Sequence, residues 1–579
     1  PVDGSEPSAY TSEGRRNALG KPKFVGLSQK CLETILPQLD VGDAFQYLKT
    51  GTDASVHEAA KRMELAEFLS GSIVRAQKPN PSRKQGFSPW SLCYGGHQFG
   101  SWASQLGDGR AVSILTTPSS WPLKGAGRTP FSRFADGLAV LRSSVREYLG
   151  SEAMAALGIP TSRALSLVHL PHVMVMRETM ETGAIVCRLA PSWLRIGSFE
   201  LPWSRDDWDN LLDLVIYAGH EVFGFGKGGR ANSQEPEDRS MAAKVLRETS
   251  RRNARTFAGW QATGFMHGVL NTDNISITGL TIDYGPYAWM DIYNANHVCN
   301  HSDGEGRYSY RNQPNIGVDA IRKLGNSLAE LIGCELEMAA KSGKTEVAEA
   351  PKGWAVETGK HGLWRDEAEK VISDVATEFT EIFVQEYRRL MGRRLGLHDS
   401  KQSDFSDLVD PLLSMMSQNH LDFSRTFRLL AQFTRIDSPH FDRLVEMLCP
   451  KSAVPQYLQN SYEEEWKEWF RTYQARLEES EISAGTSVEN RRERIRAANP
   501  RFILRQWILE EAISRLEKDS DVAFLQRVLD MANRPFDDYG EEEVDPAVCK
   551  KPTDEVMEQK TLCGIGDKQM LGFQCSCSS

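Results

Sequence analysis

The chain of 579 residues is 40% hydrophobic and 25% charged, which is the balance of a folded protein with a large core and several domains. Its net charge of −10 argues against a nucleic-acid-binding protein, although a local basic pocket for phosphates is compatible with it. The best candidate for a membrane span, residues 211–226, is interrupted by Asp213, His220 and Glu221, so we expect no span.

The first 90 residues are punctuated by proline and serine, which predicts an N-terminal extension. One amphipathic helix is expected within 56–74. The extension leads into residues 88–110, a segment dense in glycine and aromatic residues.

From Arg110 the pattern becomes strand-like. Strands rich in β-branched and large apolar residues are predicted at 110–117, 121–127, 163–170, 172–179 and 183–190. Apolar residues at helical spacing predict one helix over 138–157, between the second and third strands. Pro171 and Gly183 separate the last three strands. Strands with one inserted helix in this order are typical of the small lobe of a protein kinase.

The rest of the chain is predicted to be mostly helical. Two long helices are expected at 206–224 and about 239–263, then short strands at 275–278 and 280–283. From Trp364 to Asn533 the helical periodicity continues. The acidic end of the chain, with its glycines and cysteines, predicts a mobile tail.

We therefore predict an α+β protein with a protein-kinase-like bilobal fold. Its parts are an N-terminal extension (1–90), a small lobe with an antiparallel sheet and nucleotide-binding residues (91–200), a helical large lobe with the catalytic and metal motif (201–360), a helical C-terminal region (361–536) and a mobile acidic, cysteine-containing tail (537–579).

The run HGVLNTDNISITGLTIDYG at 267–285 has the layout of a kinase metal site. Asn274 follows His267 by seven residues, and Asp283 opens an Asp-Tyr-Gly triplet. One amide oxygen and one carboxylate, together with nucleotide phosphates, are sufficient ligands for Mg²⁺. The catalytic Asp of a kinase would stand two residues after the His, where this chain has Val269. The motif predicts metal and nucleotide binding without ordinary kinase chemistry.

Lys124 lies in a predicted strand and Glu147 in the helix that follows. In kinases a strand lysine contacts the phosphates and a helix glutamate positions it. The alternative is a pair of solvated surface charges, and the metal motif downstream favours the first interpretation.

Gly107, Gly109 and Arg110 precede the first strand pair, where backbone N–H groups and a guanidinium can meet phosphate oxygens. A plain turn is the alternative, because Val112 occupies the place of the third glycine of a kinase phosphate loop.

Asp136 and Gly137 stand just before the predicted helix, and their spacing alone predicts a helix-start turn. Arg188 and Arg195 leave a strand and enter a loop, where two guanidinia can hold a polyphosphate. Salt bridges between the lobes are the alternative for this arginine pair.

Cys575 and Cys577 are separated by one residue at the C-terminal end, which favours thiol exchange over a core role. An inert tail is the alternative.

Four runs carry a resemblance to a known family: YGGHQFG at 94–100, KGAGRTPFSR at 124–133, HGVLNTDN at 267–274 and CSCSS at the C-terminus. They resemble the selenoprotein O family, and the similarity extends from about residue 25 to the end of the chain. Some members carry selenocysteine where this chain has Cys577, a weaker nucleophile.

The resemblance implies a pseudokinase that binds ATP in reversed orientation and transfers AMP to a Ser, Thr or Tyr hydroxyl of a protein, with release of diphosphate. It implies Mg²⁺ dependence, with Mn²⁺ as the alternative ion, and mitochondrial localisation in eukaryotes. The implied ATP-contacting residues are Gly107, Gly109, Arg110, Lys124, Asp136, Gly137, Arg188, Arg195 and Asp283. Asn274 and Asp283 are the implied metal ligands, and Asp273 is the implied base.

Two alternatives to AMP transfer stay open at this point. One is an ATP-binding pseudokinase scaffold without transfer activity, which the missing aspartate at Val269 motivates. The other is a phosphotransferase. Protein substrates are the expected partners, and the sequence does not indicate their identity, the preferred hydroxyl or the oligomeric state.

Overall fold

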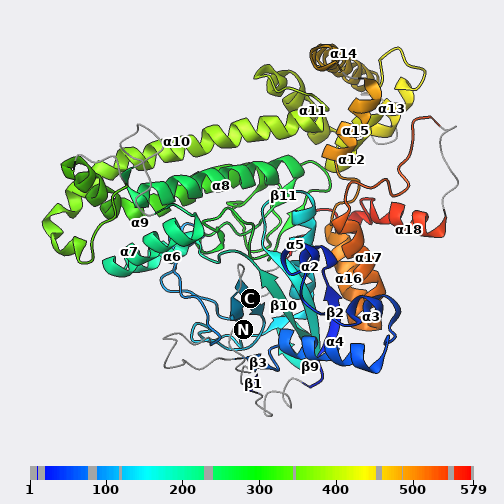
Figure 1. Ribbon diagram of the computed structural model, residues 1–579. Coiled ribbons are helices and arrows are strands. Elements are labelled where there is room, and N and C mark those ends of the chain that lie inside the picture. The colour runs from blue at the N-terminus through cyan, green and yellow to red at the C-terminus, as the bar shows by residue number, and fades with distance from the viewer. Residues whose placement is uncertain are drawn as a thin grey trace.

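The protein is described by a computed structural model that covers residues 9–10, 20–75, 88–116, 120–226, 239–342, 347–450, 459–485, 487–545 and 553–575. Within these ranges no helix is both long enough and apolar enough to cross a membrane. The architecture mixes one antiparallel sheet with many helices, as the sequence predicted at that level (Figure 1).

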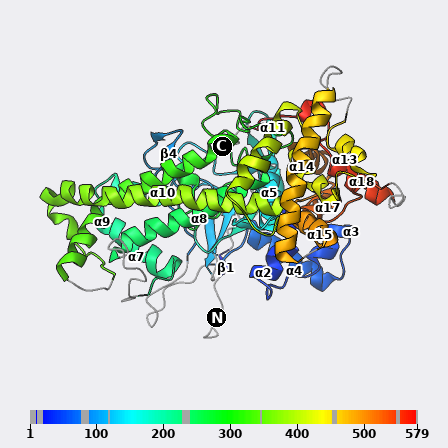
Figure 2. The same ribbon diagram turned by 90° about the horizontal axis from the view of Figure 1, so that it is seen from above.

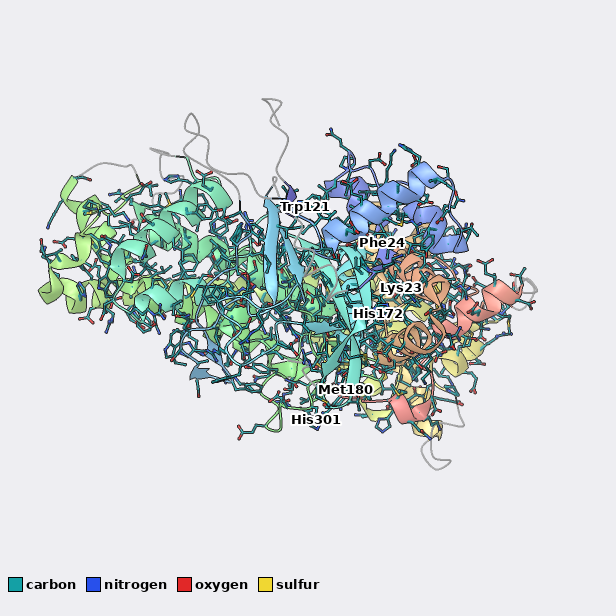
Figure 3. The ribbon with its side chains drawn as sticks, turned by 90° about the horizontal axis from the view of Figure 1, so that it is seen from below. Lys23, Phe24, Trp121, His172, Met180 and His301 are labelled. Atoms are coloured by element: carbon teal, nitrogen blue, oxygen red, sulfur yellow. The ribbon has the colours of Figure 1, made fainter. Side chains whose placement is uncertain are left out.

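The main sheet has the strand order β2-β9-β10-β7-β6, and every neighbouring pair is antiparallel. Its strands are β2 (Lys23–Leu27), β6 (Ala111–Thr116), β7 (Ser120–Lys124), β9 (Arg163–Met176) and β10 (Met180–Leu189), and β8 (Ala139–Val140) pairs with β10. Phe24 of β2 and Trp121 of β7, labelled in Figure 3, are both buried in one apolar cluster on this sheet.

Strand β9 corrects one prediction. The strands expected at 163–170 and 172–179 are one continuous strand that runs through Pro171. The pairing with β10 shifts register beside this proline, since Leu170 faces Gly183 while Met174 faces Thr182. A proline lacks the N–H group that a regular ladder needs, and a register irregularity is where a strand tolerates one.

Helices cover the sheet. Helix α5 (Leu141–Ala156) follows β8 and packs against β9 and β10, as predicted for 138–157. Helices α16 (Gln506–Asp519) and α17 (Val522–Asn533), from the far end of the chain, pack against α5 (Figure 1). The N-terminal helices are α2 (Gln29–Ile35), α3 (Ala44–Thr50) and α4 (Val56–Leu69).

Three long helices form a second layer. Helices α8 (Met241–Thr263), α9 (Gln313–Ser342) and α10 (His361–Arg394) pack on one another, and Figure 2 shows their extended parallel course. Two short helices, α6 (Ile196–Trp203) and α7 (Trp208–Tyr217), connect the sheet to this layer. The helix predicted over 206–224 ends earlier, and a π-helical turn at Ala218–Val222 follows it.

The segment between α8 and α9 is mostly irregular. It contains the short pair β11 (Phe265–Met266) and β12 (Ala288–Trp289) and a 3-10 turn at Thr272–Asn274. The strands predicted at 275–278 and 280–283 are wrong, because this segment has only isolated bridges, which join Ile275 to Thr281, Ser276 to Arg195 and Thr281 to Thr161.

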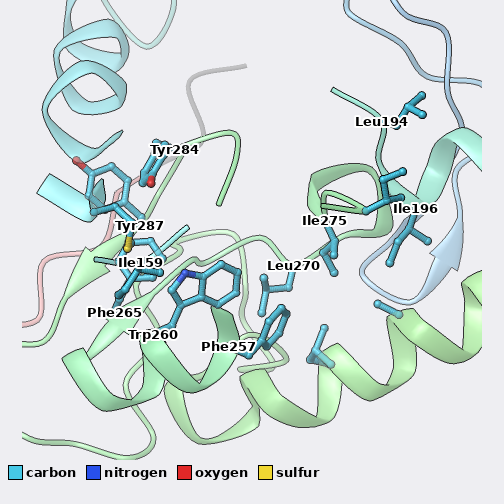
Figure 4. Packing of buried hydrophobic residues seen from close by; sticks show 14 of the residues in the cluster. Ile159, Leu194, Ile196, Phe257, Trp260, Phe265, Leu270, Ile275, Tyr284 and Tyr287 are labelled. Atoms are coloured by element: carbon cyan, nitrogen blue, oxygen red, sulfur yellow. The ribbon is translucent and has the colours of Figure 1, made fainter. Parts of the chain in front are cut away.

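A continuous apolar core lies beneath this segment. The rings of Phe257 and Trp260 of α8 pack in a tilted arrangement with centroids 4.5 Å apart, and Trp260 contacts Phe265 at 5.7 Å (Figure 4). Ile196 and Ile275 are buried in the same cluster. The irregular segment is thus held from below by close packing rather than by a regular sheet.

The C-terminal half is helical, as predicted. Beyond α10 it contains α11 (Asp410–Gln418), α12 (Phe423–Leu429), α13 (Phe441–Leu448), α14 (Gln459–Ala484), α15 (Val488–Ala498), α16, α17 and α18 (Asp554–Leu562). Part of the segment expected to be a mobile tail is therefore folded. It includes α18 and a bridge between Cys575 and Asn300.

One buried ion-pair network ties α16 to the irregular segment. Arg505, 2% exposed, donates to Asp291 at 2.7 Å and to Asp422 at 2.8 Å. Removing one partner of a buried pair leaves uncompensated charge in a medium of low polarity.

We predict that Arg505→Met lowers the free energy of unfolding by about 3–5 kcal/mol, because two buried carboxylates lose their cation. Urea titration followed by circular dichroism measures the change. The control is Arg471→Met, which breaks an ion pair with Glu468 whose arginine is 52% exposed and is expected to cost less than about 1 kcal/mol. Equal losses in the two variants would contradict the prediction.

Candidate active site

Asp283 lies at the centre of a cluster of positive charges. Its Oδ1 accepts from Arg188 at 2.9 Å and lies 3.4 Å from the Lys124 ammonium, and its Oδ2 accepts from Arg195 at 3.0 Å. Burial by itself would raise the pKa of Asp283, but the charges of Arg195, Lys124 and Arg188 outweigh it and hold the pKa well below its usual range. The carboxylate is therefore ionised at any physiological pH.

The backbone of Asp283 is itself unusual. Its φ of 56° lies in the left-handed region that side chains other than glycine rarely adopt. Residues held in this region cost free energy, and the surrounding contacts must retain them. The three cations provide such contacts.

The sheet register brings the cations together. Lys124 ends β7 and pairs with Val186 of β10, two residues before Arg188. Glu147 of α5, 2% exposed, accepts from Lys124 at 2.6 Å and from Arg188 at 2.9 Å. Lys124 and Glu147 are thus a contacting pair and not two solvated surface charges.

The two arginines are anchored by aromatic rings. Arg188 stacks on Trp193 at 4.3 Å and Arg195 stacks on Tyr94 at 4.2 Å. Both guanidinia are 2% exposed, and both contact Asp283. A cation–π contact stabilises a desolvated guanidinium in a fixed orientation.

Asp273 stands beside this cluster. Its carbonyl oxygen accepts from Arg195 at 2.9 Å, the same nitrogen that reaches Asp283. Its Oδ2 accepts from Gln98 at 3.1 Å, while its buried Oδ1 has no hydrogen-bond partner in the described chain. One carboxylate oxygen is therefore held in place and the other is free to accept a proton.

The pKa of Asp273 differs in direction from that of Asp283. Burial raises it to about 6, against the lowering effects of the Gln98 hydrogen bond and the Arg195 charge. A carboxyl group with this pKa is ionised for the most part near neutral pH and accepts a proton more readily than an exposed aspartate.

Asn274 follows Asp273 in the same 3-10 turn. Its amide nitrogen donates to the carbonyl oxygen of Val269 at 3.2 Å, which leaves the amide oxygen to other ligands. Across the described ranges, no three His, Cys, Asp or Glu side chains converge in a metal-binding group. The chemistry of Asn274 and Asp283, one amide oxygen and one ionised carboxylate, nevertheless fits Mg²⁺, which takes few protein ligands when phosphates are present.

The glycine loop lies next to Lys124. The backbone N–H of Gly125 donates to the carbonyl oxygen of Arg110 at 2.7 Å, and the carbonyl oxygen of Gly109 accepts from Ser132 at 2.5 Å. Burial lowers the pKa of Arg110, while the charges of Glu147 and Asp283 oppose that shift. The loop therefore shares the electrostatic environment of the cluster.

Gly107, at the start of this loop, has a φ of 150°, and a Cβ added there would meet the ring of Phe131 at 2.6 Å. Phe131 belongs to the run 124–133. Close packing between these two segments thus requires a glycine at this position.

Asp136 and Gly137 lie farther along the same segment. Asp136 accepts from the backbone N–H of Leu138 at 2.8 Å and from Arg177 at 2.8 and 3.1 Å. The backbone N–H of Gly127 donates to the carbonyl oxygen of Gly137 at 3.0 Å. The turn predicted from spacing is present, and a bidentate ion pair with Arg177 holds it.

Sequence reasoning missed the residues that hold the 3-10 turn at Thr272–Asn274, the candidate catalytic turn. Gln98 contacts Asp273, and the backbone N–H of His97 donates to Thr272 at 2.7 Å. His97 Nδ1 lies 2.6 Å from the buried carboxylate of Glu200, which also accepts from Thr272. From the sequence, the run 94–100 is only a motif. Its contact with this turn could not be predicted, because no periodicity links residues about 175 positions apart.

Cys575 contradicts the expectation of an exposed thiol. Its side chain is buried, its backbone N–H donates to the carbonyl oxygen of Cys299 at 3.2 Å, and its own carbonyl oxygen accepts from His301 at 3.3 Å. Cys577 lies outside the described residues, so a redox role for this cysteine stays a prediction.

Comparison with known proteins supplies independent findings. The family model described as "Protein adenylyltransferase SelO" matches residues 58–533. The chain is 38% identical over 507 residues to "Protein adenylyltransferase SelO, mitochondrial" of Schizosaccharomyces pombe, with 85% of this chain and 82% of that protein covered. It is 39% identical over 471 residues to "Protein nucleotidyltransferase YdiU" of Bordetella avium, with coverage of 80% and 82%. The YdiU protein of Cupriavidus metallidurans is 38% identical over 536 residues, with coverage of 91% and 87%.

The charge cluster generates a stability prediction. We expect Asp283→Ala to lower the free energy of unfolding by about 3 kcal/mol or more, because Arg188 and Arg195 lose their buried counter-charge. Thermal unfolding measures the change, and added diphosphate is expected to restore part of it by binding the cations that lost their counter-charge. The control Asp437→Asn alters a carboxylate that is 73% exposed and is expected to have no effect. An Asp283→Ala protein of unchanged stability would refute the charge assignment.

Proposed function

The chain belongs to the SelO protein adenylyltransferase family, and from this premise we propose that it transfers AMP from ATP to a Ser, Thr or Tyr hydroxyl of an acceptor protein and releases diphosphate. The enzyme is a nucleotidyltransferase, as the names of its relatives indicate. The observation that carries the proposal is the convergence of Lys124, Arg188 and Arg195 on Asp283, next to a buried Asp273.

The cations would bind the triphosphate of ATP. Lys124, Arg188 and Arg195 supply three positive charges in a site with little water, where electrostatic stabilisation of developing negative charge is strongest. If they hold the β and γ phosphates, the α phosphorus faces the acceptor. The backbone N–H groups of the loop with Gly107 and Gly109 would add donors to the same phosphates.

The residues of the site would then have separate roles in AMP transfer. The acceptor oxygen forms a bond to the α phosphorus, the bond from that phosphorus to the bridging oxygen breaks, and diphosphate leaves toward the cations. The proton of the acceptor hydroxyl goes to Oδ1 of Asp273, which Gln98 and Arg195 hold in position. Glu147 keeps Lys124 and Arg188 oriented and is a positioning residue.

Asn274 and Asp283 are the proposed ligands of Mg²⁺, with Mn²⁺ as the alternative ion. Held by these two side chains, the ion would supply positive charge that neutralises the leaving diphosphate. Asp136 and Gly137 are proposed to contact the nucleotide, together with Arg110.

The proposed fold follows the same premise. An antiparallel sheet with helix α5, which carries Glu147, and a helical layer whose irregular segment between α8 and α9 carries Asp273 and Asp283 support a kinase-like bilobal arrangement. The predicted boundaries, a small lobe at 91–200 and a large lobe at 201–360, are proposed with it. The name of the fission-yeast relative supports a mitochondrial location, although similar relatives are bacterial.

An isotope experiment tests the reaction. The full chain is incubated with Mg²⁺, a mixture of tryptic peptides as acceptors, and ATP labelled at either the α or the γ phosphate. We expect the α label in the peptides and the γ label in free diphosphate. Transfer of the γ label would instead identify a phosphotransferase, and binding of ATP without transfer of either label would identify a scaffold.

A substitution tests the base. We predict that Asp273→Asn lowers AMP transfer about 10²–10⁴-fold while ATP affinity, measured by calorimetry, stays close to that of the native chain. The amide keeps the size of the side chain and its contact with the Gln98 loop but cannot take a proton. Asp437→Asn is the matched control, because its carboxylate lies on the surface of another part of the chain. Undiminished transfer by Asp273→Asn would remove the proposed role of this carboxylate.

A further inference from the structure

A groove of about 550 Å³ lies beside the catalytic turn and has no role in the chemistry described above. It is lined by residues of the run 94–102, of α6 and the start of α7, and of α9 and α10. These are His97, Trp102, Trp203, Ser204, Asp206, Trp208, Glu330, His361 and Arg365. Three tryptophans in one open groove are unusual for a surface that binds nothing.

The aromatic residues form the walls. The Trp102 ring lies 5.3 Å from His97, and the Trp208 ring lies edge-on to His361 at 5.1 Å. All three indoles, including that of Trp203, are half-buried, so each keeps an accessible surface. Indole faces attract cations.

The groove also contains two carboxylates and one guanidinium. Glu330 is 1% exposed, and its Oε1 pairs with Arg365, whereas its Oε2 has no hydrogen-bond partner among the residues that the structure describes. Asp206 is exposed at the rim, and the ion pairs of the described chain do not include it. The Glu330–Arg365 pair shows that a guanidinium is accommodated here, and the exposed Asp206 carboxylate is accessible to a second cation.

The groove lies next to the proposed active site. His97 lines the groove, while the next residue, Gln98, donates to Asp273. Helix α6 begins beside Arg195, which contacts Asp283, and ends at Trp203 in the groove. Eight helical residues span about 12 Å, a distance that about four residues of extended chain cover.

We propose that this groove binds an arginine or lysine side chain of the acceptor protein, about three to five residues from the hydroxyl that receives AMP. The proposal rests on the proposed function, since it names the substrate class of the same site. The overall charge of −10 would also attract a basic acceptor segment. The groove thus selects acceptors by a basic residue near the modified hydroxyl.

The test uses fluorescein-labelled peptides that carry one tyrosine in a glycine and alanine background and one arginine at a distance of about one to seven residues. Binding to the full-length Asp273→Asn chain is followed by fluorescence anisotropy without ATP, so that the readout does not require transfer. We expect about tenfold tighter binding when the arginine stands three to five residues from the tyrosine than when it is absent.

Two variants locate the effect. Asp206→Asn removes the rim charge and suits the left-handed backbone at this position, where φ is 54°, because asparagine tolerates that region. Trp203→Ala removes one aromatic wall. Both are expected to abolish the preference for arginine, whereas Asp437→Asn, outside the groove, is expected to retain it.

Three results would overturn the proposal: no dependence on the arginine position, an equal affinity when leucine replaces arginine, or a preference that survives in both groove variants. The outcome is separable from that of the isotope experiment. Position-dependent binding with no transfer of α label would refute AMP transfer but support the groove proposal. Transfer of α label without an arginine preference would support AMP transfer but refute the groove proposal.

Discussion

The Asp283 carboxylate and the three cations around it are the interaction on which the rest of the site depends. Arg188 and Arg195 are almost fully buried, and buried guanidinia are retained only when their charge is matched and their donors are occupied. Asp283 contacts both arginines, Glu147 also contacts Arg188, and Asp108 lies 3.8 Å from Arg195. A polyphosphate requires cations that are held in place before it arrives, and these ion pairs hold them.

The fold maintains this cluster with elements from distant parts of the chain. Neighbouring strands β7 and β10 present Lys124 and Arg188 close together, and α5 presents Glu147 to both. The irregular segment after α8 presents Asp273 and Asp283, and aromatic packing beneath it holds that segment. Helices α16 and α17 support α5 from behind, so the C-terminal region contributes to the position of Glu147. Helices α16 and α17 therefore help to keep the site rigid.

Two carboxylates in the same site have opposite electrostatic environments. Asp283 is surrounded by cations, and its pKa is held low, whereas burial raises the pKa of Asp273 to about 6. A metal ligand has to stay ionised, and a base has to accept a proton. The geometry thus supports a division of labour between two aspartates ten residues apart, one for charge and one for proton transfer.

The sequence by itself determined the local features and the spacing of the motifs. The helix at α5, the helical C-terminal half and the contact between Lys124 and Glu147 were predictable, because each depends on periodicity or on a motif with a known chemical role. The roles of Asn274 and Asp283 stay predictions from the same motif. Tertiary structure alone decided that Gln98 holds Asp273, that Glu200 joins His97 to the catalytic turn, that Cys575 is buried and that β9 continues through Pro171. These contacts join residues far apart in the chain or depend on the register of a neighbouring strand. Local propensity cannot predict such contacts, because they form only when the packed core brings the segments together.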